Sequence, residues 1–418
     1  MSRNAGASDV PVMRRRPWLV AGRRRRADWA RASCLAQIAQ SDASVQHPPA
    51  IRARPLRLGL DLGLPQGARL SADVLLAQAV AQAEQLTEQG DPLQAAQAWQ
   101  DLASLLGEQT PARCYQRLQT AMTRNTQGWG GSEAENQLWG DRDKHDVLAD
   151  CHRLLQPALY LEIGVEEGRS LSRARGPALG LDPCPGLTLM APLDALARLL
   201  TTRSDTFFRD QAERLLQPRP ELVFIDGMHL FEFALRDFRN VERDASPSTL
   251  VLIDDIFPCH PTQAERRRRS GAWTGDIWKL HQILRETRPD LTLLALNAFT
   301  TGLLLIAGLD PDNRVLWHQE PALVTRYRDE PPASPEALER QGAIPSDHPL
   351  FSRLLATLRQ GRDAGWGVAE VRVALAELQP AIAEAEQAFQ GQARVLARLH
   401  WPEPDRATSR QIADPVDR

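Results

Sequence analysis

The middle of the chain, from about residue 156 to 311, is predicted to fold as an α/β domain with a seven-stranded, mostly parallel sheet flanked by helices. Short apolar segments alternate there with segments of helical spacing. The segments around Val223 and Val251 are continuously apolar, as in strands that are buried on both faces. Only residues 297–302 separate the last two strands, which predicts an antiparallel hairpin closing one edge of the sheet.

The individual elements follow from the spacing of apolar residues. The predicted strands span residues 158–163, 178–181, 205–208, 222–225, 250–253, 291–296 and 303–307. Helices are predicted at 144–155, 168–175, 193–201, 230–243 and 276–288. Most strands are therefore followed by a helix, which is the connection that a parallel sheet requires.

The segment before this domain has two parts. Residues 1–68 are rich in Arg and Pro without periodicity, which favours a disordered head over an Arg-rich targeting peptide. Residues 69–127 have helical spacing, with Ala83, Ala95 and Trp99 where two helices of a hairpin would cross. This helical segment resembles a tetratricopeptide-type hairpin. It is either a module that binds a protein partner or a helical cap on the next domain.

The α/β domain is assigned to residues 128–311, and the remainder of the chain is again different in composition. Residues 312–348 are polar and Pro-rich, which predicts a linker. Residues 349–400 predict C-terminal helices, at 350–360 and 368–399, of which the second is either a packing arm or a helix that forms a homodimer. The end, residues 401–418, is predicted to be a frayed tail.

Composition and charge exclude several classes of protein. The net charge of −3 gives no general basic field for nucleic acid. The five cysteines are far apart and form no CxxC pair, so neither a disulfide framework nor a zinc cluster is expected. The sequence has no apolar run of the roughly 20 residues that a membrane span needs. We expect a cytoplasmic protein that binds neither nucleic acid nor membrane.

The first motif with chemical content is a glycine-bearing turn between a strand and a helix. It reads Glu162-x-Gly164-x-x-x-Gly168, and its glycines allow a sharp turn and a close approach to a ligand. Glu162 stands where a dinucleotide fingerprint has its first glycine. A carboxylate there would repel a pyrophosphate but suits a cationic ligand such as S-adenosylmethionine. The alternative is an ordinary tight turn.

Two further acids could contact such a ligand. Asp182 ends the next predicted strand, where a carboxylate can accept hydrogen bonds from both hydroxyls of a ribose. The alternative is a turn aspartate before Pro183. Asp205 opens the predicted strand 205–208 and would lie near the adenine, with a turn position as the alternative.

The third group of residues predicts the reaction. Asp226 and His229 follow one strand, and Asp254 and Asp255 end the next, so they should converge at the carboxyl edge of the sheet. Clustered carboxylates favour a divalent cation, above all Mg²⁺. Such an ion could orient an acceptor hydroxyl, and His229 would either take its proton or serve as an extra ligand of the metal. Alternatively, Asp254 and His229 cap loop and helix, and Asp255 pairs with the basic run 266–269.

The order of these motifs resembles the class I S-adenosylmethionine-dependent methyltransferases, whose fold is Rossmann-like. The last two motifs resemble the metal-dependent O-methyltransferases of the macrolide-sugar and catechol types. The resemblance covers about residues 146–309. It implies Asp182 as ribose ligand and Asp226, Asp254 and Asp255 as metal ligands, although the catechol type has Asn where Asp255 stands.

The sequence therefore predicts a Mg²⁺-assisted O-methyltransferase that acts on a hydroxyl of a small molecule or glycan. Residues 266–269 and Trp273 could bind the acceptor, or they form a solvated loop beside core tryptophans. Two other functions remain open: a helical-repeat scaffold with a relict α/β domain, and a metal-dependent hydroxylase or hydrolase on the same fold.

Overall fold

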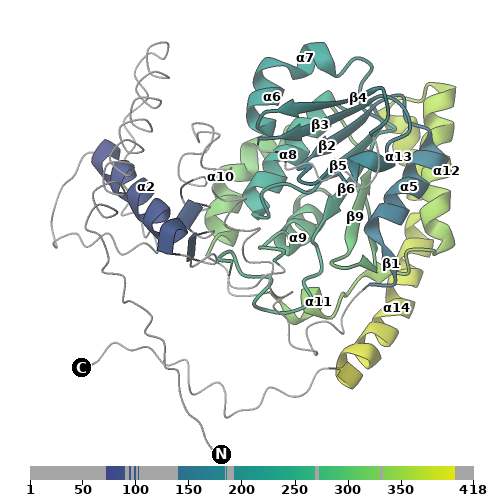
Figure 1. Ribbon diagram of the computed structural model, residues 1–418. Helices are drawn as coiled ribbons and strands as arrows, with labels where there is room; N and C mark the ends of the chain where they lie inside the picture. The colour runs from purple at the N-terminus through teal and green to yellow at the C-terminus, as the bar shows by residue number, and fades with distance from the viewer. Residues whose placement is uncertain are drawn as a thin grey trace, which may run out of the picture. The chain divides into compact units, whose positions relative to one another are not determined.

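A computed structural model describes residues 72–89, 140–183, 185, 193–268, 273–329 and 333–400, together with the isolated positions 94, 95, 98, 99 and 102 (Figure 1). The chain forms two compact units, Met1–Gly90 and Asp91–Arg418. The predicted head (1–68), most of the helical segment after residue 89 and the tail (401–418) lie outside the described residues.

The described part of the first unit is one amphipathic helix, α2 (Ala72–Gln89). Its buried residues Ala79, Val80, Ala83 and Thr87 recur at steps of one to four, which places them on one helix face. Positions 94, 95, 98, 99 and 102 are also helical. The rest of the predicted hairpin lies outside the described residues, so the tetratricopeptide-like interpretation stays a prediction.

The second unit contains the predicted α/β domain. Its strands are β1 (Arg142–Asp143), β2 (Tyr160–Ile163), β3 (Ala178–Asp182), β4 (Ala197–Thr201), β5 (Leu222–Ile225), β6 (Leu250–Asp254), β7 (Thr292–Leu296), β8 (Ala298–Phe299), β9 (Leu303–Ala307) and β10 (Ala343–Ile344). Eight of them form the central sheet in the order β10-β7-β9-β6-β5-β2-β3-β4, and β1 pairs with β8 in a separate two-stranded sheet.

The pairing confirms the predicted mostly parallel sheet. All pairs from β6 through β5, β2 and β3 to β4 are parallel. β9 alone among the described strands of this sheet runs antiparallel to both of its neighbours, β6 and β7. The predicted hairpin is therefore present, but it does not close the edge, because β10 adds an eighth strand beside β7.

Helices cover both faces of the sheet (Figure 1). They are α5 (Lys144–Leu155), α6 (Ser204–Asp210), α7 (Ala212–Leu215), α8 (Phe231–Asp244), α9 (Trp278–Thr287), α10 (Val315–Tyr327), α11 (Pro335–Leu338), α12 (Pro349–Ala364), α13 (Val368–Ala376) and α14 (Gln379–His400). Side chains alternate between the faces of a strand. Val223 and Ile225 of β5 thus join one core with α8, α9 and α10. Leu222 and Phe224 join a second core with α5, α12 and α13.

Two neighbouring predictions are reversed in the structure. Residues 193–201, predicted as a helix, contain strand β4, and residues 205–208, predicted as a strand, lie in helix α6. Leu199 and Leu200 have a spacing compatible with either structure, and pairing along the free edge of β3 favours the strand. The aromatic pair Phe207 and Phe208 favours a strand locally, but the helix buries both rings in the core.

The predicted linker, residues 312–348, is instead part of the domain. It contains α10, α11 and the edge strand β10. Leu316, Leu323 and Tyr327 of α10 are buried in the core that α8 and α9 share. The segment is locally polar because the remaining faces of these short elements point to solvent, and this polarity led to the wrong prediction.

The C-terminal helices form where they were predicted, with one break. Helix 368–399 is divided into α13 and α14, because Pro380 lacks the amide hydrogen that a continuous helix would need there. Val371, Leu375 and Ile382 pack into the same core as α5 and α12, which favours the packing-arm interpretation. Within the described part of the chain, none of the helices combines the length and apolarity that a membrane crossing demands.

Candidate active site

The candidate site lies at the carboxyl ends of four neighbouring strands, β3, β2, β5 and β6. Two of the loops that follow them are in direct contact. Gly164, the first residue after β2, has φ +88°, and a Cβ atom there would overlap the carbonyl oxygen of Asp226 after β5. Asp226 N in turn donates to Ile163 O at 2.8 Å. Glycine is therefore required at position 164, both for its backbone conformation and for the contact between the loops.

The glycine loop, residues 164–170 after β2, is held by Asp182 at the end of β3. Asp182 Oδ2 accepts hydrogen bonds from Val165 N at 3.0 Å and from Glu166 N at 2.9 Å. The predicted helix 168–175 is reduced to one 3₁₀ turn, Leu171–Arg173. The loop is thus fixed by a carboxylate rather than by the start of a long helix.

Glu162 is fully buried in β2, and its two carboxylate oxygens are both engaged within the chain. Tyr160 Oη donates to Oε2 at 2.7 Å, and Ser170 Oγ donates to Oε1 at 2.6 Å. Burial raises the pKa of Glu162 to about 8, although both hydroxyl groups act in the opposite direction. In this structure Glu162 ties the far end of the glycine loop, at Ser170, to strand β2.

The raised pKa of Glu162 gives a prediction for stability. A carboxyl group with a folded-state pKa of about 8 contributes stability that is complete below its usual pKa and is lost as the pH rises toward 8. The loss is at most about 1.4 kcal/mol for each pH unit. We expect Glu162→Gln to remove this decline, since a neutral amide can still bond both hydroxyls. Urea unfolding between pH 5 and 8 measures it, with exposed Glu213→Gln as control; profiles that stay parallel for wild type and Glu162→Gln would contradict it.

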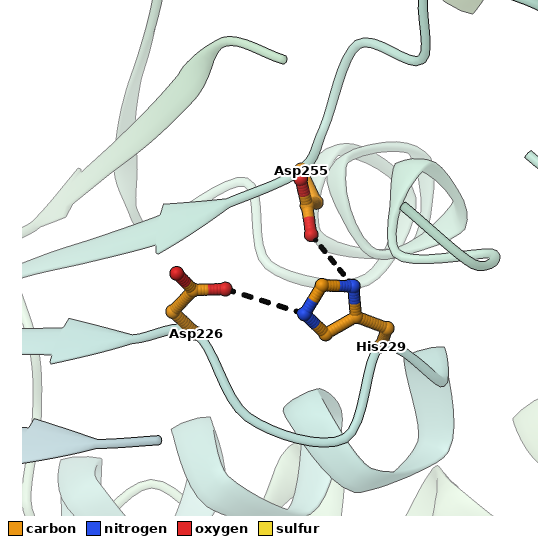
Figure 2. A group of neighbouring side chains, drawn as sticks. All are labelled: Asp226, His229 and Asp255. Atoms are coloured by element: carbon orange, nitrogen blue, oxygen red, sulfur yellow. Dashed lines mark ion pairs between the residues drawn. The ribbon is translucent and has the colours of Figure 1, made fainter. Parts of the chain in front are cut away.

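The predicted group of acids and His229 does converge (Figure 2). His229 Nε2 lies 3.4 Å from Asp226 Oδ1, and its Nδ1 lies 2.9 Å from Asp255 Oδ2. Nδ1 is also 2.9 Å from the carbonyl oxygen of Trp273, whose ring stacks on the imidazole. His229 and Asp255 both have positive φ, an uncommon conformation for residues other than glycine. The imidazole is thus held between two carboxylates and a tryptophan.

A residue that the sequence analysis did not select, Lys144, completes the site. It is the first residue of α5, and its Nζ lies 3.0 Å from Asp226 Oδ2 and contacts Asp254 Oδ2 as well. Asp254 is 2% exposed, and its other oxygen, Oδ1, has no hydrogen-bond partner among the residues that the structure describes. A signal was present in the sequence, because only two of the 50 basic residues are lysines, Lys144 and Lys279.

The charges of this site shift one another's pKa values. Burial opposes ionisation of Asp226, but Lys144 and His229 outweigh it and hold the pKa of Asp226 below its usual range. Burial raises the pKa of Asp254 to about 8, and the neighbouring Asp226 and Asp255 add to the effect. Burial also opposes the charged form of His229, yet Asp255 and Asp226 raise its pKa well above the usual value. The site therefore attracts positive charge.

The structure brings together three residues that could hold a divalent ion, and His229 takes the place of Asp254 among them. Asp226, His229 and Asp255 each offer a ligand atom, and these atoms lie within 4.8 Å of one another. Two carboxylates and an imidazole are acceptable donors for Mg²⁺, Mn²⁺ or a related ion. Asp254, predicted as a third metal ligand, instead contacts Lys144.

Other residues that were predicted to contact the donor or the acceptor have structural partners instead. Asp205 lies in α6, and its Oδ2 pairs with Arg236 Nη1 at 2.9 Å, so the strand that would have placed it near an adenine is absent. Arg266 pairs with Glu232 and Asp276, and Trp278 is buried, which are structural roles. Of the proposed acceptor residues in the described range, Trp273 does reach the site, through its contact with His229.

Comparison with known proteins gives matches among solved structures alone. No protein-family model matches the sequence, and no curated protein matches it. The O-methyltransferase TomG from Streptomyces achromogenes, solved with S-adenosylmethionine, is 14% identical over 42% of this chain and 90% of its own, with a TM-score of 0.32. A putative O-methyltransferase from Klebsiella pneumoniae is 18% identical over 42% and 90%, with a TM-score of 0.31.

The MycE methyltransferase of mycinamycin biosynthesis, solved with Mg and S-adenosylhomocysteine, is a further match. It is 17% identical over 40% of this chain and 49% of its own, with a TM-score of 0.29. All three matches cover less than half of this chain. At these identities and TM-scores, the function of the site has to be argued from its own geometry.

Proposed function

We propose that this protein is an S-adenosylmethionine-dependent O-methyltransferase that acts on a hydroxyl group of a small molecule or glycan with the help of a divalent ion. One observation carries the proposal. A glycine loop braced by Asp182 lies directly beside an Asp226–His229–Asp255 group, and the two are joined by the contact of Gly164 with Asp226. A donor site and a site for an acceptor hydroxyl therefore meet at one edge of the sheet.

The donor would bind along the glycine loop. Gly164 and Gly168 allow its backbone to approach the ligand closely, and Asp182 at the end of β3 would accept hydrogen bonds from the ribose hydroxyls. Glu162 would act indirectly, by fixing the loop through Ser170.

The acceptor would bind beside His229. S-adenosylmethionine, when bound, would supply the methyl group and leave as S-adenosylhomocysteine. His229 would accept the proton of the acceptor hydroxyl as its oxygen takes up that group. Asp226 and Asp255 orient the ring from its two nitrogens, and Trp273 limits access of water from one side. A divalent ion held by Asp226 and Asp255 would lower the pKa of the hydroxyl and leave His229 to accept the proton. Alignment of the reacting atoms would supply much of the rate.

Transfer of a radiolabelled methyl group tests the proposal. The purified protein is incubated with labelled S-adenosylmethionine and a panel of catechols and hydroxylated glycosides, with Mg²⁺ or with a chelator. We expect label in at least one hydroxyl acceptor, at a rate that the chelator lowers. Label found on nitrogen acceptors alone, in a parallel panel of amines, would contradict the proposed O-methylation.

A further inference from the structure

The segment that carries Lys144 is fixed to the domain by several independent contacts. β1 pairs with β8 in parallel, and Asp141 N donates to Asn297 O at 2.8 Å. Gly140 lies so close to Ala298 that a Cβ atom would overlap its backbone. Asp143 then caps α5 by accepting from His145 N at 2.7 Å. These contacts bring a residue from outside the central sheet to the carboxyl ends of β5 and β6.

Lysine has properties that this position requires. An ammonium group is a compact charge with three donors that can point in different directions, whereas the guanidinium of arginine is a planar fork. Lys144 Nζ lies between Asp226 and Asp254, with the ring of Phe224 6.0 Å away. The chain uses arginine for all but two of its 50 basic residues, and one of the two lysines stands where a single ammonium joins two carboxylates.

We infer that Lys144 is a built-in cation of the cluster formed by Asp226, Asp254 and Asp255. It holds Asp254 away from the metal and confines a divalent ion to Asp226 and Asp255, beside the imidazole of His229. The charges support this division. One ammonium and one divalent ion together carry the three positive charges that balance the three carboxylates. Removal of the ammonium would free Oδ2 of Asp254. Oδ1, which is buried and has no hydrogen-bond partner among the described residues, would then give a metal a second ligand atom on the same carboxylate.

This inference concerns the metal of the proposed function, and it can fail or succeed independently of that function. Metal affinity is measured without donor or acceptor. Loss of methyl transfer would therefore leave the inference standing, and an unchanged metal affinity would overturn it while the proposed transfer remained. Lys144 is a positioning residue in this account, since it acts on the metal through Asp226 and Asp254.

The test is the affinity of the full-length protein for Mn²⁺, measured by electron paramagnetic resonance of the free ion. We expect Lys144→Met to bind Mn²⁺ at least about tenfold more tightly than wild type, because Asp254 becomes a ligand. The double variant Lys144→Met with Asp254→Asn should lose this gain. Arg142→Met is the matched control, since Arg142 pairs with Asp150 outside the cluster, and it should bind as wild type does. An affinity of Lys144→Met equal to or weaker than that of wild type would overturn the inference.

A second comparison keeps the test decisive if Lys144→Met does not fold. Asp254→Asn and Asp255→Asn remove the same charge from adjacent positions in the otherwise unchanged chain. We expect Asp255→Asn to weaken Mn²⁺ binding about tenfold or more and Asp254→Asn to change it less than about threefold. Equal losses in the two variants would mean that Asp254 ligates the metal beside Lys144, and the inference would be wrong.

Discussion

Replacement of Gly164 by alanine is expected to destabilise the domain by about 3 kcal/mol and to abolish donor binding. The residue has φ +88°, and left-handed backbone costs a residue with a Cβ atom about 1–2 kcal/mol. The new methyl group would also overlap the carbonyl oxygen of Asp226, and overpacking adds about 1–3 kcal/mol. Relief of the overlap must separate the glycine loop from the loop that carries His229.

Urea unfolding and calorimetric titration with S-adenosylmethionine measure the two effects. Gly365→Ala is the matched control, because Gly365 has φ +67° at the end of α12 and an added Cβ atom meets nothing within 4 Å there. It should show the backbone cost alone, with donor affinity as in wild type. Equal destabilisation by the two variants, with binding retained by both, would show that the contact between the loops is unimportant.

Substitution of His229 by glutamine is expected to lower kcat by about 10²–10⁴-fold, the usual contribution of a general base. The donor should still bind, because the side chains that brace the glycine loop are Asp182 and Glu162 and not His229. Turnover with the acceptor found in the labelling panel gives kcat, and titration calorimetry gives the donor affinity. A kcat within about threefold of wild type would exclude His229 as the base.

The pH dependence of turnover should follow the same residue. Asp255 and Asp226 outweigh burial and raise the pKa of His229 well above its usual value, so without a metal the imidazole is protonated near neutral pH. Because only the neutral ring can accept a proton, kcat should rise with pH. A divalent ion near Asp226 and Asp255 opposes the charged ring, so saturating Mg²⁺ should move the rising limb to lower pH. A limb that Mg²⁺ does not move would contradict metal binding beside His229.

The sheet and the convergence of the site could be predicted from the sequence for definite physical reasons. β5 and β9 begin and end at the predicted residues, because continuous apolar runs bounded by polar residues or glycine leave one arrangement for a doubly buried strand. Asp226 and Asp255 come together because the carboxyl ends of parallel neighbours share one edge of the sheet. Both inferences use order along the chain and require no knowledge of tertiary contacts.

The remaining features depend on contacts between distant segments. Lys144 reaches the site because β1 pairs with β8, a pairing of two short segments that no local pattern indicates. β10 joins the sheet through two residues inside a polar stretch. β4 forms a strand because it pairs with the edge of β3, and α6 forms a helix because it buries Phe207 and Phe208. Both outcomes go against the local sequence preference. The predicted role of Glu162 as a ligand also did not account for Tyr160 and Ser170, which take both of its oxygens.

The proposed methyl transfer requires that the glycine loop and Asp182 bind S-adenosylmethionine. Titration calorimetry of wild type and of Asp182→Ala, each with and without Mg²⁺, measures this binding. We expect wild type to bind with micromolar affinity and Asp182→Ala to show no binding, since both the ribose contact and the brace on Val165 and Glu166 are removed. Absence of binding to the folded wild-type protein under both conditions would contradict the methyltransferase assignment.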